Sequence, residues 1–70
     1  MLLENLGNRL RVLRKERIGL SQEKFALRLG VDRTYYSAIE RGKQNVTITI
    51  LKKIADGFEM SLSEMLEGVE

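Results

Sequence analysis

Residues 21–42 read SQEKFALRLGVDRTYYSAIERG and contain the start and stop signals of two short helices. Ser21 is a good N-cap, because its hydroxyl can accept a hydrogen bond from a free backbone N–H of the first turn. Gly30 can adopt the left-handed conformation that ends a helix at no steric cost. Asp32 and Gly42 are the corresponding start and stop signals of the second helix. The connection between the two helices is therefore short enough to form only a sharp turn.

Two helices joined by so tight a turn are typical of a helix-turn-helix, whose second helix lies in the major groove of DNA. On a helical wheel of residues 33–41, Tyr36 and Ile39 share the apolar side that must face the core. The opposite side carries Thr34, Ser37, Ala38 and Arg41, with Arg33 and Tyr35 at its flanks. A solvated helix usually presents long Glu and Lys side chains in i,i+4 pairs, and this one does not. The pattern favours a face that enters a groove about 12 Å wide, although the ring of Tyr35 could instead cover the edge of the core.

Length and composition exclude several classes of protein. The 70 residues predict one small domain, residues 1–70, and the absence of proline fits an all-α fold. There is no Cys and no His, so thiolate metal sites and the commonest general base are missing. We therefore expect no enzyme, no metal and no cofactor, and no small-molecule ligand is evident. No apolar run approaches the roughly 20 residues of a membrane span, so we expect a cytoplasmic protein with no membrane partner.

Charge is distributed unevenly along the chain. Residues 1–53 hold all 12 Lys and Arg against five acidic residues, whereas residues 54–70 hold five acidic residues and no basic one, for net charges of +7 and −5. A basic body suits a polyanion, which would repel the acidic end. The alternative is that these charges only solvate a small surface.

The flanking segments also show helical periodicity. Leu3, Leu6, Leu10 and Leu13 share one face of a helix over residues 3–17, and a Gly within that helix weakens the prediction for its first turn. Thr47 caps a fourth helix with more apolar positions than one side can bury, and Ser61 or Ser63 opens a fifth. The surplus apolar side chains should therefore meet either the fifth helix or a second subunit, and Met60 and Met65 lie either in the core or in an interface.

Two polar residues beside the apolar faces need partners. Glu40 lies next to the inward side of its helix, where burial is costly unless the carboxylate is paired. Arg14, directly after Leu13, is its predicted partner in a structural ion pair. Gln22, at the first position of its helix, could meet a phosphate through its side chain and a free backbone N–H, or it could be an ordinary solvated residue.

The residues that define these features resemble the Cro/CI-type (Xre) helix-turn-helix family. The resemblance rests on Leu20 to Glu23, Phe25-Ala26, Gly30-Val31, Arg33 to Tyr35, Ser37 and Ile39 to Gly42, and it continues through Leu51 and Lys53 to Ala55. Within the family, this run together with Asn45 is most like the controller proteins of restriction–modification systems. The resemblance implies a five-helix Cro/CI repressor-like domain and a homodimer that binds paired half-sites in double-stranded DNA to regulate transcription.

The resemblance also implies roles for individual residues. Arg33, Thr34, Tyr35 and Ser37 would face bases, whereas Gln22, Lys43, Asn45 and Thr47 would hold phosphates. The dimer would form mainly through the last two helices, with Ile50, Phe58, Met60, Leu62, Met65 and Leu66 as interface residues. Departures from the family pattern are one extra residue between Arg14 and Ser21, Val46 where proline is common, and Tyr36 where an aliphatic residue is commoner.

Two other readings of the same motif stay open at this point. One is a phage-type or other Xre repressor. The other is an antitoxin-like module that binds a protein instead of DNA, with the acidic end and the region of Met60 and Met65 as its docking surface.

Overall fold

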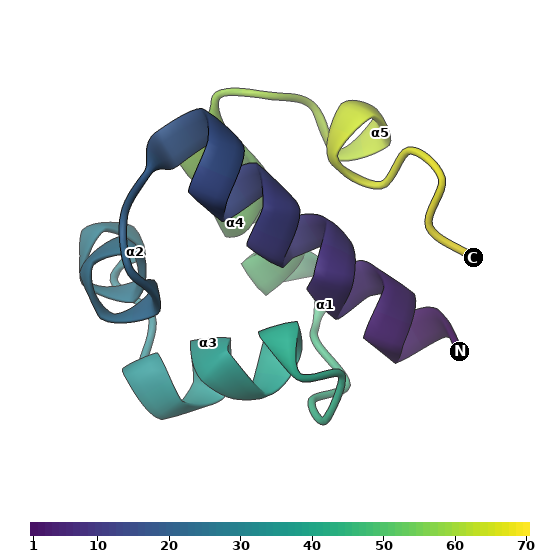
Figure 1. Cartoon of the computed structure of the whole chain (residues 1–70), viewed down its shortest axis with the longest axis horizontal. Coiled ribbons are helices and arrows are strands. Elements are labelled where there is room, and N and C mark those ends of the chain that lie inside the picture. Colours follow the sequence, from purple (N-terminus) through teal and green to yellow (C-terminus); the bar gives the residue numbers. More distant parts are fainter.

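Five α-helices and one π-helical turn follow one another along the chain (Figure 1). The structure is a computed structural model that describes residues 1–70, and it contains no strand. The elements are α1 (Leu2–Leu13), the π-helical turn (Arg14–Ile18), α2 (Gln22–Leu29), α3 (Arg33–Glu40), α4 (Ile48–Phe58) and α5 (Leu62–Met65). The all-α, five-helix prediction is confirmed. No helix is both long and apolar enough to cross a bilayer.

The predicted helix starts carry the expected caps. The hydroxyl of Ser21 accepts from the backbone N–H of Lys24 at 3.2 Å, and the carboxylate of Asp32 accepts from Tyr35 N–H at 3.0 Å. Thr47 caps α4 in the same way, and Ser61, one of the two predicted alternatives, caps α5. The connection between α2 and α3 turns at Gly30, whose φ of 73° is left-handed. Local sequence signals therefore set the limits of the helix-turn-helix.

The first helix differs from the predicted range of residues 3–17 at both ends, because it begins at Leu2 and its α-helical part stops at Leu13. It runs through Gly7, as predicted, and this residue is buried where α1 crosses α3. A Cβ on Gly7 would lie 2.7 Å from the Ile39 carbonyl oxygen and closer still to that of Glu40. The residue that costs helix propensity is therefore the one that permits the close crossing.

The extra residue between Arg14 and Ser21 is accommodated by the π-helical turn. Gly19 N–H donates to the Arg14 carbonyl oxygen, five residues earlier, at 2.7 Å. A π-helical turn closes one residue later than an α-helical turn, so it takes up one more residue of the chain. Gly19 then ends the helix at a φ of 72°.

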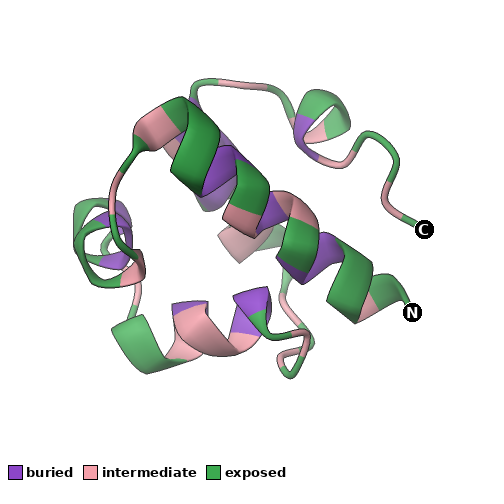
Figure 2. Ribbon diagram, in the orientation of Figure 1, coloured by how far each residue is buried: buried purple, intermediate pink, exposed green.

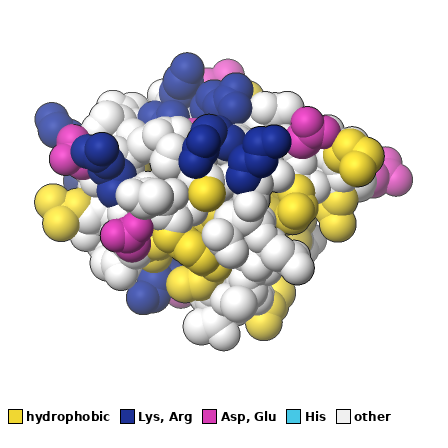
Figure 3. Space-filling view, turned by 90° about the horizontal axis from the view of Figure 1, so that it is seen from below, with side chains coloured by type: hydrophobic (Ala, Val, Ile, Leu, Met, Phe, Trp, Pro, Cys, Tyr) yellow, Lys and Arg dark blue, Asp and Glu magenta, His cyan; other side chains and the backbone are white.

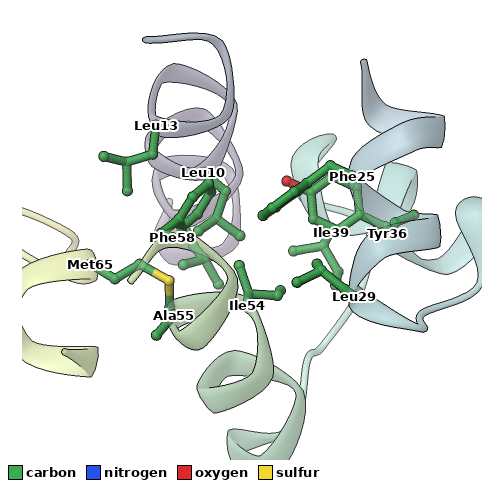
Figure 4. Close-up of a cluster of buried hydrophobic side chains, with 12 residues drawn as sticks. Leu10, Leu13, Phe25, Leu29, Tyr36, Ile39, Ile54, Ala55, Phe58 and Met65 are labelled. Atoms are coloured by element: carbon green, nitrogen blue, oxygen red, sulfur yellow. The ribbon is translucent and has the colours of Figure 1, made fainter. Parts of the chain in front are cut away.

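One hydrophobic core joins all five helices (Figure 4). Its twelve buried residues are Leu6, Leu10, Leu13, Phe25, Ala26, Leu29, Tyr36, Ile39, Ile54, Ala55, Phe58 and Met65. The ring of Phe25 stacks on Phe58 at a centroid distance of 4.8 Å and meets Tyr36 edge-on at 5.6 Å. Figure 4 shows Met65 of α5 pointing toward Ala55 of α4. The core holds α3 by one side only and leaves its opposite side outside (Figure 2).

Candidate nucleic-acid interface

The outer side of α3 is partly open to solvent, and its exposed residues lie at the start of the helix. Tyr36 and Ile39 are 0% and 1% exposed, which confirms the predicted inward side. Arg33 and Thr34 are exposed, and Tyr35 and Ser37 are half-buried. Tyr35 packs against the edge of the core while part of it stays accessible. The four predicted base contacts therefore all belong to a helix whose orientation is set by its buried side.

A bidentate ion pair fixes α3 to the π-helical turn that follows α1. Arg14 Nε and Nη2 donate to Glu40 Oε2 and Oε1 at 2.8 and 3.0 Å, and Arg14 Nη1 donates to the Leu20 carbonyl oxygen at 2.8 Å. Gln22 Nε2 donates to Glu40 Oε1 at 2.8 Å. The predicted Arg14–Glu40 pair is confirmed, and through Gln22 it also holds the start of α2.

This network determines the charge state of its members. Burial acts to raise the pKa of Glu40, but hydrogen bonds from Arg14, with contributions from Tyr36 and Gln22, outweigh it and hold the pKa below its usual value. The hydrogen bond to Glu40 raises the pKa of Arg14. Burial, assisted by the Glu40 carboxylate, raises the pKa of the Tyr36 phenol. Although the Tyr36 hydroxyl is near this pair, it has no partner in hydrogen-bonding geometry. The pair is ionised at neutral pH and the phenol keeps its proton.

The side chain of Gln22 is already engaged, which modifies the prediction for this residue. One N–H of its amide serves the buried Glu40 carboxylate, so this amide belongs to the structural network. Its backbone N–H at the first position of α2 has no intrahelical partner and stays available to an anion. The alternative of an ordinary solvated side chain is wrong, because the side chain is half-buried and bonded.

The loop of residues 41–47 lies beyond the other end of α3 (Figure 1). Lys43, Asn45 and Thr47 are all exposed there. Thr47 Oγ1 accepts the capping bond from Ile50 N–H at 3.3 Å, which leaves its hydroxyl proton free to donate. The predicted phosphate contacts thus fall at both ends of α3, with α2 at one end and this loop at the other.

A second Arg–Glu pair lies on the surface between α2 and α3. Arg33 Nη1 and Glu23 Oε2 are 3.3 Å apart, and their side chains are 65% and 70% exposed. Sequence reasoning missed Glu23, because no local spacing relates a residue of one helix to a residue of the next. The pair lines a polar recess of about 410 Å³ together with Arg14, Ser21, Gln22 and Ser37.

The basic residues have different tasks. Arg9 donates to the carbonyl oxygens of Glu64 and Met65, and Arg17 donates to that of Phe58, so these two arginines fasten α5 and the end of α4. Six basic side chains form no ion pair or side-chain hydrogen bond: Lys15, Lys24, Arg28, Arg41, Lys43 and Lys53. Figure 3 shows Lys and Arg forming a band across the upper part of the face on which α3 lies. No group of acidic residues could hold a metal ion.

The six predicted dimer residues fall into two groups, two that are buried in the core and four that are half-buried at the surface. Phe58 and Met65 are 1% and 0% exposed within the single chain, so their assignment to an interface is wrong: both complete the core. The other four predicted interface residues are half-buried: Ile50, Met60, Leu62 and Leu66. Leu66 also lines a mostly apolar cavity of about 250 Å³ between the start of α1, the loop after α3, α4 and the C-terminal segment.

Comparison with known proteins identifies the family. Residues 10–65 match the family described as Helix-turn-helix. The chain is 52% identical over 64 residues to control protein C.MunI from Mycoplasma sp, covering 91% of this chain and 86% of the relative. The chain belongs to the helix-turn-helix family and, within it, to the control proteins of which C.MunI is a member.

Two solved structures share this fold. One is the restriction-modification controller protein C.AhdI from Aeromonas hydrophila, with a TM-score of 0.84 and 40% identity, covering 90% of this chain and 94% of that chain. The other is the C.Esp1396I tetramer in complex with its natural 35 base-pair operator. That match has a TM-score of 0.85 and 36% identity and covers 99% of this chain and 90% of that chain.

Proposed function

We propose that this chain is a sequence-specific DNA-binding transcriptional regulator, in particular the controller protein of a restriction–modification system. The observation that carries the proposal is the two-sided character of α3. Its inner side is fixed by Tyr36, Ile39 and the bidentate Glu40 pair, and its outer side presents short polar groups and Arg33. A rigidly held helix of this kind can place its N-terminal residues against base edges in the major groove.

In this proposal Arg33 is the principal base contact. A guanidinium can donate two parallel hydrogen bonds to guanine O6 and N7, which is worth about 1–3 kcal/mol of discrimination. Thr34, Ser37 and the accessible part of Tyr35 contact the neighbouring bases or the adjacent backbone. The charge of Arg33 also opposes the helix dipole, because a cation at the first position of a helix lowers the stability of that helix. Since Arg33 does not stabilise its own helix, its position is better explained by binding of DNA.

Phosphate contacts fix the position of the protein along the DNA. The proposed contacts lie on both sides of α3. On one side is the backbone N–H of Gln22 at the start of α2, and on the other are Lys43, Asn45 and Thr47 on the loop after α3. These contacts add affinity for any sequence and make it salt-dependent, because bound cations are released from the DNA. A basic face of this kind attracts a polyanion such as DNA, and we propose that the protein meets this DNA in the cytoplasm.

We further propose that two copies bind together as a homodimer through the half-buried apolar side chains Ile50, Met60, Leu62 and Leu66. A 70-residue chain has a small core, so association stabilises it. A twofold arrangement places two α3 helices about 34 Å apart, one DNA turn. The operator complex of the related C.Esp1396I supports assembly on DNA for this kind of protein. The proposal assigns no catalytic role to any residue.

Selection of duplexes from a randomised pool tests the proposal. The expected result is a palindromic pair of half-sites about one turn apart, with affinity for random duplex falling steeply as salt increases. A chain that selects no sequence and binds duplex without salt dependence is instead a protein-binding module on the same scaffold.

A further inference from the structure

The exposed ion pair of Glu23 and Arg33 links α3 to a residue of α2. We infer that Glu23 is a positioning residue for base recognition, which orients the guanidinium of Arg33 toward guanine. The inference rests on the proposed function and concerns a residue for which the family resemblance implied no role.

The geometry of the contact leaves the useful edge of the guanidinium open. Glu23 Oε2 lies 3.3 Å from Nη1 of Arg33. The opposite edge, formed by Nε and Nη2, carries two parallel N–H groups, and no acceptor of the protein engages them. This edge has the donor spacing that guanine O6 and N7 require. Glu23 therefore restrains the Arg33 side chain and leaves its Nε and Nη2 donors free to recognise the base.

The position of Glu23 is also right for this task. It lies in the first turn of α2, where a carboxylate is stabilised by the helix dipole. Gln22, its neighbour, is tied to the buried Glu40 carboxylate, so the start of α2 is held by the core network. Glu23 and Arg33 line the same polar recess as Ser37, one of the predicted base contacts.

Restraint of this kind benefits specificity more than affinity. A free arginine loses side-chain entropy when it is fixed on a base, and a pre-oriented one loses less. A carboxylate near DNA repels phosphates at the same time, so it lowers affinity for every sequence. Glu23 thus weakens non-specific binding while it favours the correct base, and the two effects can be separated by measurement.

The test compares Glu23→Gln with Arg33→Ala, the double variant and the control Glu16→Gln. The control removes the same charge from an exposed residue that forms no ion pair. Each variant is measured on a duplex selected by the wild-type chain and on the same duplex with the Arg33-dependent base pair changed. We expect Glu23→Gln to bind random duplex more tightly and to lose about two- to fivefold of discrimination at that base pair, the range set by an exposed ion pair. Glu16→Gln should retain the wild-type discrimination, and unfolding midpoints should stay unchanged.

The remaining outcomes are decisive. Discrimination that is the same in Glu23→Gln as in the wild type overturns the inference and leaves the proposed function intact. A change in base preference caused by Glu23→Gln in the Arg33→Ala background also overturns it, since Glu23 would then contact a base itself. A wild-type chain that selects no duplex overturns the proposed function, and this inference with it.

Discussion

Two Arg–Glu pairs join helices in this molecule, and their surroundings give them different properties. Arg14 and Glu40 form a two-point contact with side chains only 7% and 0% exposed. Arg33 and Glu23 form a single contact at 3.3 Å with side chains 65% and 70% exposed. Removing one partner of the buried pair leaves a charge out of water, whereas the exposed partners remain hydrated. The same residue types therefore hold two helices together in one place, whereas in the other they remain exposed, and we propose that Arg33 there contacts DNA bases.

The largest effect should come from breaking the buried pair. Arg14→Met leaves the Glu40 carboxylate without its main donor and should lower the free energy of unfolding by about 3–5 kcal/mol, measured by urea denaturation. The double variant Arg14→Met/Glu40→Met removes both charges and should recover a large part of that loss. Equal loss in the single and double variants would contradict the unpaired charge as the cause.

Breaking the exposed contact should affect recognition and leave stability nearly unchanged. Arg33→Ala should cost about 1–3 kcal/mol of discrimination at one base pair per half-site. Its free energy of unfolding should stay within about 0.5 kcal/mol of the wild type. Competition binding with single-base variants of the selected duplex measures the first quantity, and urea denaturation measures the second. A uniform loss of affinity for all sequences would place Arg33 on a phosphate.

Acid should distinguish the two pairs again. The pKa of Glu40 is lowered in the folded state, so its stabilising contribution is complete above the unfolded-state pKa, about 4.3, and is lost as pH falls through the lower folded-state pKa. The slope from this one group is at most about 1.4 kcal/mol per pH unit. Urea denaturation at several pH values below 5 should show a shallower decline for Glu40→Gln than for the wild type. Glu23→Gln is the matched control from the exposed pair, and an equal change of slope in both variants would contradict the assignment.

The smallest effect should come from a phosphate contact, which lies outside both pairs. Lys43→Ala should weaken binding to all duplexes by a similar factor and lower the slope of log affinity against log salt by about 1. Titrations at several salt concentrations on the selected duplex and on random duplex provide the comparison. A change confined to one base pair would instead make Lys43 a base contact.

Local signals predicted a large part of the fold and of the buried fastening. The caps at Ser21, Asp32 and Thr47 each depend on atoms within three residues, so they could be recognised from sequence. The Arg14–Glu40 pair could be predicted because each residue adjoins an apolar face whose direction periodicity defines. The base and phosphate contacts remain proposals.

Contacts between segments far apart in the chain escaped prediction. The close approach of Gly7 to α3, the carbonyl contacts of Arg9 and Arg17, and the pairing of Glu23 with Arg33 all depend on how helices cross. The apolar Phe58 and Met65 were assigned to an interface because an apolar face does not reveal what covers it.

By itself the sequence determined where the helices of the helix-turn-helix start and stop and which side of α3 is apolar, since capping and periodicity act over a few residues. Only the tertiary structure decided that the core takes Phe58 and Met65, that Gln22 supports Glu40, and that Glu23 meets Arg33. The reason is physical: burial and pairing depend on the distance between elements, and that distance is set only when the helices pack together.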